Sequence, residues 1–516
     1  MEGTLWAFLP AVIAIVLALA TKQVYVSLFL GIFVGSLMYA GGDPLKAIFT
    51  LYQVMSEKVG GNTPIIVFLV VLGILVVLMQ KSGGARAYGD WASTKIKSRG
   101  GALAATAGLG CLIFVDDYFN CLTVGSVMRP VTDKFRISRT KLAYIIDATA
   151  APVCIIAPIS SWAAAVAGEL EGDGLMVFIS TIPFNVYALL TLAMVFALCF
   201  VKFDFGKMKK NEMVAESTGD LYAGVPEDSS PSEEVAANPN GKLRHLFIPV
   251  LVLIACCVGG MIYTGFFYNW DTGLIGSELQ SANVIEAFSN CDAGMSLAIG
   301  STVALILISI YYMLSKAISF KDITASFTEG FKAMVPAILI LTFAWSISGI
   351  MGAKGGYLDA QAFVENNLAN SAFPQFLFPA IFFILAGLIA FSTGTSWGTF
   401  GVLVPIAVTI LGGSGTLAIM TVSATLGGAV FGDHVSPISD TTILASAGAR
   451  CNHVEHVNTQ LPYAALIAVI VALAYVIGGL CATMGSVLSC VLMWVVALVL
   501  FALAILFIKS KEKKNA

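Results

Sequence analysis

The chain has 516 residues, of which 58% are hydrophobic and only 11% are charged, and its formal net charge is −3. Soluble domains carry about 25% charged residues, so a chain this long and this poor in charge cannot cover a water-facing surface. It must therefore expose apolar surface to lipid. The slightly negative charge gives no electrostatic support to nucleic-acid binding, and we expect no nucleic-acid partner.

Apolar runs recur along the whole chain at lengths close to the roughly 20 residues that a helix needs to cross a bilayer. They lie near residues 4–20, 24–41, 63–80, 140–170, 175–202, 244–268, 291–315, 333–352, 415–449, 460–480 and 485–508. The first has an acid and no Lys or Arg before it, which favours a membrane helix over a signal peptide. The stretch 203–243 is rich in Pro, Ser, Glu and Asn. We interpret it as a solvated cytoplasmic linker between halves 1–202 and 244–516.

Two further apolar stretches, 101–130 and 373–412, are interrupted by the polar sequences FVDDYFNC and FSTGTSWG. Lys and Arg cluster on both sides of the first stretch, and positive charge is retained on the cytoplasmic side of a membrane. A re-entrant hairpin keeps both clusters inside, whereas a crossing does not. The same rule makes 373–412 a hairpin that enters from outside, because otherwise the basic tail KSKEKKNA would lie outside. We therefore predict about eleven transmembrane helices plus two re-entrant hairpins, in the cell membrane, with the N-terminus out and the C-terminus in.

The two halves look like copies of one unit. Short matches follow the same order in both: KSGG with AKGG, Pro130 with Pro405, and APISS with SPISD. Each hairpin is followed by an apolar segment with proline at its middle, 140–170 in the first half and 415–449 in the second. Because the hairpins enter from opposite sides, we predict an all-α polytopic membrane protein with inverted-topology repeats and broken helices.

The candidate site residues lie at the hairpin tips and helix breaks, because non-helical backbone at membrane depth must face protein or a water-filled cavity. A carboxylate at the centre of a membrane helix costs about 2.5–3.5 kcal/mol and usually serves an ion or proton pathway. Hard cations prefer carboxylate, carbonyl and neutral oxygens. The candidate ion- or substrate-binding residues are Asp117, Asn120, Thr395, Ser396, Asp433, Ser436, Ser439, Asp440 and Thr441. Na⁺ is expected at Asp433, Asp440, Thr441 and Asn120, and the candidate proton-carrying residues are Asp433, Asp440, Asp116, Asp147 and His434.

Structural alternatives stand beside these roles. Asp116 and Asp117 can cap the hairpin turn, and Asp433 can cap a helix end. Asp147 lies one to two helical turns after Arg139 and Lys141 and can form a salt bridge with either. His434 can be a hydrogen-bonded packing residue. The sequence HVEH, which ends at His456, matches no zinc motif, and we interpret it as a polar loop.

The segment GDHVSPISDTTILAS (432–446) resembles the signature of the NhaC family of sodium/proton antiporters. FSTGTSWGTFGVLVPIA (391–407) and the segment 114–162 are similar to that family too, so the resemblance covers most of the chain except the linker and the tails. It implies Na⁺/H⁺ exchange by a fold with two hairpins and two broken helices. Because the family also contains members that resemble malate/lactate exchangers and amino-acid carriers, it indicates the machinery more firmly than the cargo.

We therefore expect a secondary transporter that exchanges Na⁺ for H⁺ by alternating access. The alternative is a Na⁺- or H⁺-coupled carrier of a small organic acid or amino acid on the same scaffold. An organic anion needs an arginine or free helix N-termini, and the second-half site has no arginine before Arg450, which favours cations. No nucleotide-binding motif is present, and GTSWG matches the hydrolase pattern GxSxG only outside its usual strand-to-helix context. We expect no enzymatic activity and no cofactor, and a homodimer stays open.

Overall fold

The computed structural model describes the chain except for residues 1–2, 22, 171–173, 202, 226–237, 270–273, 277–278, 282, 284–286, 288–290, 352–356, 361, 364–373, 413–414, 438 and 516. In the described part, helices alternate with short turns, and the strands form one small antiparallel hairpin, β1 (Tyr268–Asn269) with β2 (Leu274–Ile275). Seven described helices are long and apolar enough to span a membrane alone, and three bent pairs pass the same test together. The prediction of an all-α polytopic membrane protein is confirmed.

The first half begins with helices that precede the first hairpin. These are η1 (Leu5–Phe8), α1 (Leu9–Thr21), α2 (Val24–Tyr39), α3 (Pro44–Gly61), α4 (Thr63–Lys81) and α5 (Gly84–Lys95). The axis of α3 is bent by 119° from α2, so the two do not form one straight span. Asp43 fixes the start of α3, because its carboxylate accepts hydrogen bonds from the backbone N–H groups of Leu45 and Lys46. We did not predict α3 from the sequence.

Two segments of the first half carry the predicted first hairpin and the predicted broken helix. The hairpin consists of α6 (Arg99–Leu112) and α7 (Asp117–Lys134), and the broken helix consists of α8 (Arg139–Ala148), α9 (Ala151–Cys154) and α10 (Ser161–Ala167). The gap between α9 and α10 contains Pro158, which cannot donate a backbone hydrogen bond. The hydroxyl of Ser160 caps the start of α10. The rest of this half is α11 (Gly174–Thr181), η2 (Ile182–Phe184), α12 (Val186–Phe200) and α13 (Gly206–Thr218).

The second half repeats the order of hairpin and broken helix. It opens with α14 (Arg244–Phe267), α16 (Ala293–Leu314) and α17 (Phe320–Met351), followed by η3 (Gln375–Leu377). The hairpin is α19 (Phe378–Thr393) and α20 (Ser396–Leu411), and the broken helix is α21 (Thr416–Val435) and α22 (Asp440–Ala449). The chain ends with α23 (His453–Leu480), η4 (Ala482–Met484) and α24 (Ser486–Asn515).

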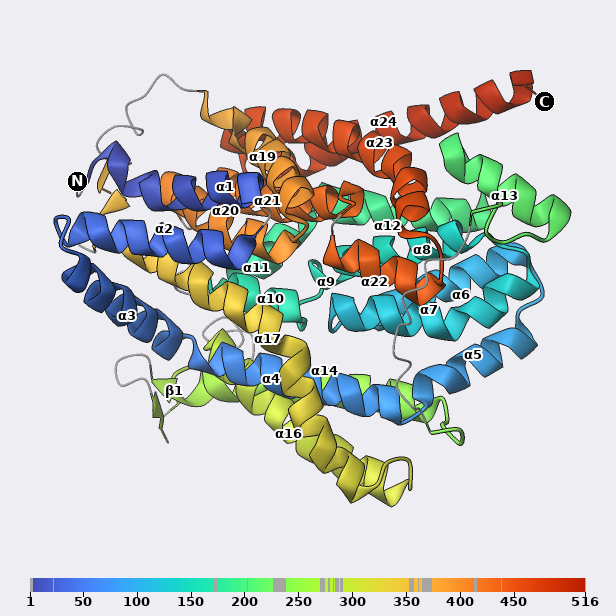
Figure 1. The fold of residues 1–516 in the computed structure, drawn as a ribbon, viewed down its shortest axis with the longest axis horizontal. Coiled ribbons are helices and arrows are strands. Elements are labelled where there is room, and N and C mark those ends of the chain that lie inside the picture. The colour runs from blue at the N-terminus through green and yellow to red at the C-terminus, as the bar shows by residue number, and fades with distance from the viewer. Residues whose placement is uncertain are drawn as a thin grey trace.

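The two hairpins occupy opposite halves of the molecule. In Figure 1, α6 and α7 lie in the half that also holds α13, and α19 and α20 lie in the half that holds α1. Glycines bring the hairpins close to the second broken helix. A Cβ atom on Gly125 of α7 would lie 2.4 Å from the backbone of Gly448 in α22, and one on Gly428 of α21 would lie 2.2 Å from the carbonyl oxygen of Phe383 in α19. Small residues at these crossings let membrane helices pack backbone to backbone.

Helix α13 lies inside the segment expected to be a solvated linker. It packs against the first hairpin and the broken helix that follows it. Its Glu212 is buried and accepts a hydrogen bond from the backbone N–H of Ser138 at 2.8 Å. The same carboxylate forms ion pairs with Arg99 of α6 and, at 3.4 Å, with Lys141 of α8. Lys141 also pairs with Asp204 at 2.7 Å. The segment therefore joins the halves and also fastens the outer ends of α6 and α8.

We expect the replacement Glu212→Gln to lower the free energy of unfolding by about 3 kcal/mol near neutral pH, because it removes one partner from a buried ionic network. Burial raises the pKa of Glu212, but the charges of Lys141 and Arg99 outweigh burial and hold the pKa below its ordinary value of 4.5. A carboxylate with a lowered pKa stabilises the fold above its unfolded pKa and loses that effect as the pH falls through its folded pKa. The thermal stability of the wild type should therefore fall below about pH 4.5.

The thermal midpoint in detergent, measured between pH 7 and pH 3.5, checks this expectation. Glu216→Gln is the matched control, since Glu216 lies one turn further along α13 and is 64% exposed. It should behave like the wild type at every pH. If Glu212→Gln and Glu216→Gln melt alike at pH 7, the packing of α13 does not depend on the Glu212 network.

Candidate functional site

The break in the second broken helix, between Val435 and Asp440, is built around Asp433. The side chain of Asp433 is buried, and its Oδ2 accepts a hydrogen bond from the hydroxyl of Thr441 at 2.5 Å. Its backbone carbonyl accepts from the backbone N–H of Ser436 and from the hydroxyl of Thr442, both at 3.1 Å. The carboxylate is therefore not a simple helix cap, because it reaches across the break to the next helix.

The other serines of this break have structural contacts. The hydroxyl of Ser436 donates to the carbonyl of Phe391 at 2.7 Å, which ties the break to the second hairpin. Ser439 caps α22 by accepting from the backbone N–H of Thr442, and its hydroxyl lies 3.2 Å from that of Thr441. Asp440 begins α22, but its side chain lies outside the described part of the structure.

Asp147 connects the first broken helix to the second. It lies buried at the end of α8, and its Oδ2 accepts from the side-chain amide of Gln460 at 2.6 Å and from the hydroxyl of Thr442 at 3.1 Å. Nε2 of His456 lies 3.4 Å from the same oxygen. The Gln460 amide also donates to the carbonyl of His434 at 2.8 Å. Asp147 is thus part of a polar network that spans α8, α21, α22 and α23.

The salt-bridge interpretation of Asp147 is wrong. Lys141 pairs with Asp204, and Arg139 pairs with Asp133 at 2.8 Å and donates to the carbonyl of Ala449. Both cations are bound at the outer end of α8, about two turns away from Asp147. Asp147 is therefore not held in a structural salt bridge with Lys141 or Arg139.

The tip of the first hairpin is held by Asn120. Its amide nitrogen lies 2.7, 2.9 and 3.0 Å from the carbonyl oxygens of Gly110, Ile113 and Thr149. These carbonyls belong to the end of α6, the hairpin turn and the end of α8, so one side chain joins the hairpin to the first broken helix. The amide oxygen of Asn120 is buried and has no hydrogen-bond partner among the described residues. That oxygen is the atom that remains for a cation or solute.

The two hairpins approach each other through tryptophans. The indole N–H of Trp162, at the start of α10, donates to Oδ2 of Asp117 at 2.9 Å. The Trp162 ring packs against Phe400 and Trp397 of the second hairpin, with ring centroids 5.0 and 5.7 Å apart. Asp117 is therefore linked, through one tryptophan, to the tip of the opposite hairpin.

The second hairpin tip carries Thr395 and Ser396. Thr395 caps α20 by accepting from the backbone N–H of Gly398 at 3.4 Å. The hydroxyl of Ser396 and the indole N–H of Trp397 are buried and have no hydrogen-bond partner within the described ranges. These two donors are therefore available to a bound group at the start of α20.

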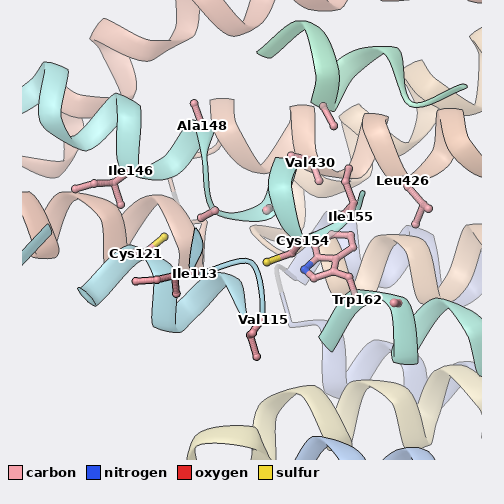
Figure 2. Close-up of a cluster of buried hydrophobic side chains, with 14 of the residues drawn as sticks. Ile113, Val115, Cys121, Ile146, Ala148, Cys154, Ile155, Trp162, Leu426 and Val430 are labelled. Carbon is pink, nitrogen blue, oxygen red and sulfur yellow. The ribbon is translucent and has the colours of Figure 1, made fainter. Parts of the chain in front are cut away.

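Four of the predicted carboxylates lie around one buried side chain, that of Cys121. Cys121 of α7 is buried and lies within electrostatic reach of Asp116, Asp117, Asp147 and Asp433. Figure 2 shows Cys121 in the apolar packing that the first hairpin shares with both broken helices. The residues around these acids form a buried interface between the first hairpin and both broken helices. We call Asp116, Asp117, Asp147 and Asp433 the acidic cluster.

Sequence reasoning missed or misplaced several polar residues of the site. His456 is not in a polar loop, because it is fully buried in α23, and Gln460 follows one turn later on the same helix. Their spacing of four residues in a long membrane helix was the available signal. His434 bonds through Nδ1 to the hydroxyl of Tyr187 at 2.9 Å, as a packing histidine would. Thr442 lies within the predicted segment 415–449 but is not among the candidate site residues of the sequence.

Comparison of the sequence with known proteins identifies its family. Residues 164–480, more than half of the chain, match the model of the Na⁺/H⁺ antiporter family. The chain belongs to this family. An uncharacterised protein of Haemophilus influenzae is 38% identical over 498 residues, which is 93% of this chain and 91% of that protein. The resemblance stated from the sequence is confirmed.

Shorter matches connect this antiporter family member to proteins with named cargo. The malate-2H⁺/Na⁺-lactate antiporter of Bacillus subtilis is 30% identical over 165 residues, 31% of this chain and 33% of that one. The arginine/ornithine antiporter of Halobacterium salinarum is 39% identical over 116 residues, 22% of this chain and 24% of that one. The chain is a secondary transporter of the antiporter class.

A solved structure shares the fold. The YdaH transporter of Alcanivorax borkumensis aligns with a TM-score of 0.56 and 14% identity, over 90% of this chain and 98% of that one. At this identity the likeness concerns the fold alone.

Proposed function

We propose that this antiporter exchanges Na⁺ for H⁺ across the cell membrane, with the cation bound at Asp433 and Thr441 in the break of the second broken helix. The single observation that carries the proposal is the acidic cluster, in which four buried carboxylates come together at the contact of hairpin and broken helices. Buried charges must be compensated by protons, cations or basic side chains. Both transported ions can do so at these oxygens.

The surroundings of Asp147 and Asp433 support a cation over an anion. The described hydrogen-bond donors to these two carboxylates are the neutral side chains of Gln460, Thr441 and Thr442. In addition, α8 ends at Ala148 and α21 ends at Val435, so the carbonyl ends of two helices meet the acids. A helix C-terminus carries a partial negative charge, which favours a cation.

A specific observation favours a second candidate, exchange of a small organic acid or amino acid. Ser396 and Trp397 offer buried donors at the N-terminus of α20, where a carboxylate is stabilised by the helix dipole. Two relatives are named for malate, lactate, arginine or ornithine exchange. This candidate predicts a solute near the tryptophans, whereas Na⁺/H⁺ exchange predicts none there.

Transport in proteoliposomes with an imposed pH gradient tests both candidates. We expect Na⁺ added outside to drive proton movement, with Li⁺ as the best substitute and K⁺ as a poor one. The second arm offers malate, lactate, arginine and ornithine under the same gradient. Proton movement with an organic solute and none with Na⁺ alone would overturn the proposed function in favour of the second candidate.

The proposed orientation places the outer ends of both first-hairpin helices in the cytoplasm. In Figure 1, the start of α1 and the end of α24 lie at opposite ends of the long axis. We expect Lys97→Cys and Arg136→Cys, both at exposed positions, to react with a membrane-impermeant thiol reagent only from the cytoplasmic side. Lys46→Cys, at the start of α3, is the control that should react from outside. Labelling of Lys97→Cys and Arg136→Cys from different sides would contradict the re-entrant hairpin.

A further inference from the structure

Asp147 and His456 form a buried pair next to the proposed cation site. Nε2 of His456 lies 3.4 Å from Oδ2 of Asp147, close enough for an ion pair, and both side chains are buried. Neither ring nitrogen of His456 has a hydrogen-bond partner among the described residues, and neither does Oδ1 of Asp147. An imidazole beside a carboxylate with open nitrogen and oxygen positions is a place where a proton can be held.

The groups that face this pair come from several helices. The largest electrostatic influences on Asp147 from other side chains are those of His434 and His456. Tyr144 of α8 interacts with Asp147, Tyr187 of α12 interacts with both Asp147 and Asp433, and Cys121 of α7 faces the acidic cluster. The two histidines are therefore the basic side chains that the described network offers to Asp147.

Thr442 lies between this pair and the cation site. Its hydroxyl oxygen is 3.1 Å from Oδ2 of Asp147 and 3.1 Å from the backbone carbonyl oxygen of Asp433. A threonine hydroxyl has one hydrogen to donate, so it can serve one of these two acceptors at a time. The acceptor that it leaves keeps its other hydrogen bond, from Ser436 at Asp433 or from Gln460 at Asp147, and gains a lone pair for another partner.

We propose that Asp147 and His456 together hold the exchanged proton, and that the hydroxyl of Thr442 couples this proton to the cation at Asp433. The inference rests on the proposed exchange of Na⁺ for H⁺. With the proton on the pair, an imidazolium compensates the Asp147 carboxylate, and Thr442 donates to the carbonyl of Asp433. When the proton leaves to water on the side of the membrane to which the site is open, the carboxylate is no longer compensated by an imidazolium. It then attracts the hydrogen of the Thr442 hydroxyl. The Asp433 carbonyl keeps the hydrogen bond from the backbone N–H of Ser436, and the lone pair that Thr442 leaves can join the Asp433 carboxylate and Thr441 around a cation.

This arrangement makes proton and cation exclude each other without a shared carboxylate. Proton binding blocks a cation ligand, and by thermodynamic linkage cation binding must weaken proton binding by the same factor. Thr442 acts as a positioning residue, since it need not touch the cation itself. Gln460 supports the arrangement, because its amide holds Asp147 and the carbonyl of His434 in fixed relation.

The first experiment looks at the proton site without any transported cation. Infrared difference spectra between pH 5 and pH 9, recorded on the purified full chain in Na⁺-free choline buffer, report protonation of carboxyl and imidazole groups. We expect the titration of this pair to disappear in His456→Gln, which removes the imidazole, and to move by about one pH unit or more in Asp147→Asn, because loss of an opposite charge at this distance shifts a pKa by that amount. Asp433→Asn should retain this titration.

The matched control is His245→Gln. His245 is also buried, but it lies on α14, where its Nδ1 accepts from the backbone N–H of Lys242 at 3.2 Å. Thermal midpoints confirm that each variant is folded, and His456→Asn replaces any His456→Gln preparation that is not. An unchanged titration in the folded His456 variant would overturn the assignment of the proton to the pair.

The second experiment measures coupling by the dependence of Na⁺ affinity on pH. If one proton excludes one Na⁺, the apparent Kd rises about tenfold for each pH unit below the pKa of the pair. We expect Thr442→Val to reduce this slope to about threefold or less, while Thr442→Ser, which keeps the hydroxyl, restores it. A wild-type slope in folded Thr442→Val would overturn the role of Thr442.

These outcomes separate this inference from the proposed function. Wild-type protein that binds no Na⁺, while the titration of the pair is present and is lost in His456→Gln, would refute Na⁺/H⁺ exchange and the Thr442 coupling but would support the proton pair. Na⁺-dependent proton movement with an unchanged His456→Gln titration would support the function and refute the pair.

Discussion

Replacement of Asp433 by Asn is expected to abolish Na⁺ binding and Na⁺-driven proton movement while leaving the protein folded. Asn has the same volume as Asp and can still accept the hydrogen bond from the hydroxyl of Thr441. It removes the negative charge that a cation needs in a buried site, where few other charges compensate it. We expect Na⁺ affinity to fall at least about a hundredfold, equal to roughly 2.7 kcal/mol, because hydrogen bonds and ion contacts with charged groups are worth more than neutral ones.

Na⁺ titration calorimetry and proton flux in liposomes, on the same preparations, check this expectation. Asp292→Asn is the matched control. Asp292 caps α16 by accepting from the backbone N–H of Met295 at 2.6 Å, and Asn caps helices about as well as Asp. That variant should transport normally. If Asp433→Asn binds Na⁺ like the wild type, Asp433 is a structural residue and the cation site lies elsewhere.

The second large effect is expected from Gly125→Ala, which adds one methyl group where α7 crosses α22. The new Cβ would lie 2.4 Å from the carbonyl carbon of Gly448 and 2.6 Å from its Cα. Real Cβ atoms essentially never approach backbone this closely, and a backbone segment cannot rotate away as a side chain can. Separating these helices also moves Thr442 and the acidic cluster. We expect a loss of about 3 kcal/mol in the free energy of unfolding, at the upper end of overpacking effects.

The comparison that isolates this effect is Gly108→Ala in the other helix of the same hairpin. A Cβ on Gly108 meets no atom within 4 Å, and Ala favours a helix over Gly. The thermal midpoint and transport rate of Gly108→Ala should equal or exceed those of the wild type. Equal behaviour of the two variants would show that α7 and α22 do not need their close contact.

Elements of this fold that depend on local sequence could be predicted. The apolar stretches indicated where two pairs of helices begin and end, since α6 and α7 span 99–134 against the expected 101–130, and α19 with α20 span 378–411 against 373–412. Whether each pair re-enters the membrane stays a prediction of the charge rule. Proline and glycine marked both helix breaks. Helices α3 and α5 were missed because polar and charged residues interrupt their sequences, so neither contains the long apolar run by which the membrane helices were recognised.

Contacts between distant residues could not be predicted. Nothing local shows that Lys141 turns to Asp204 and Glu212 rather than to Asp147, because the choice depends on α13 lying beside α8. The site residues were predicted as types and positions, at the tips and breaks. Their partners were not, since Gln460 and His456 lie over 300 residues from Asp147 and meet it only through the packing of α23.

The most direct test of the central claim, that proton and cation exclude each other at the acidic cluster, is the number of protons released when Na⁺ binds. Calorimetric Na⁺ titrations of the purified protein, in two buffers of equal pH and different ionisation enthalpy, give that number without any transport assay. We predict proton release in the wild type near neutral pH and none in Asp147→Asn. Na⁺ binding to the wild type that releases no protons at any pH between 6 and 9 would contradict the account.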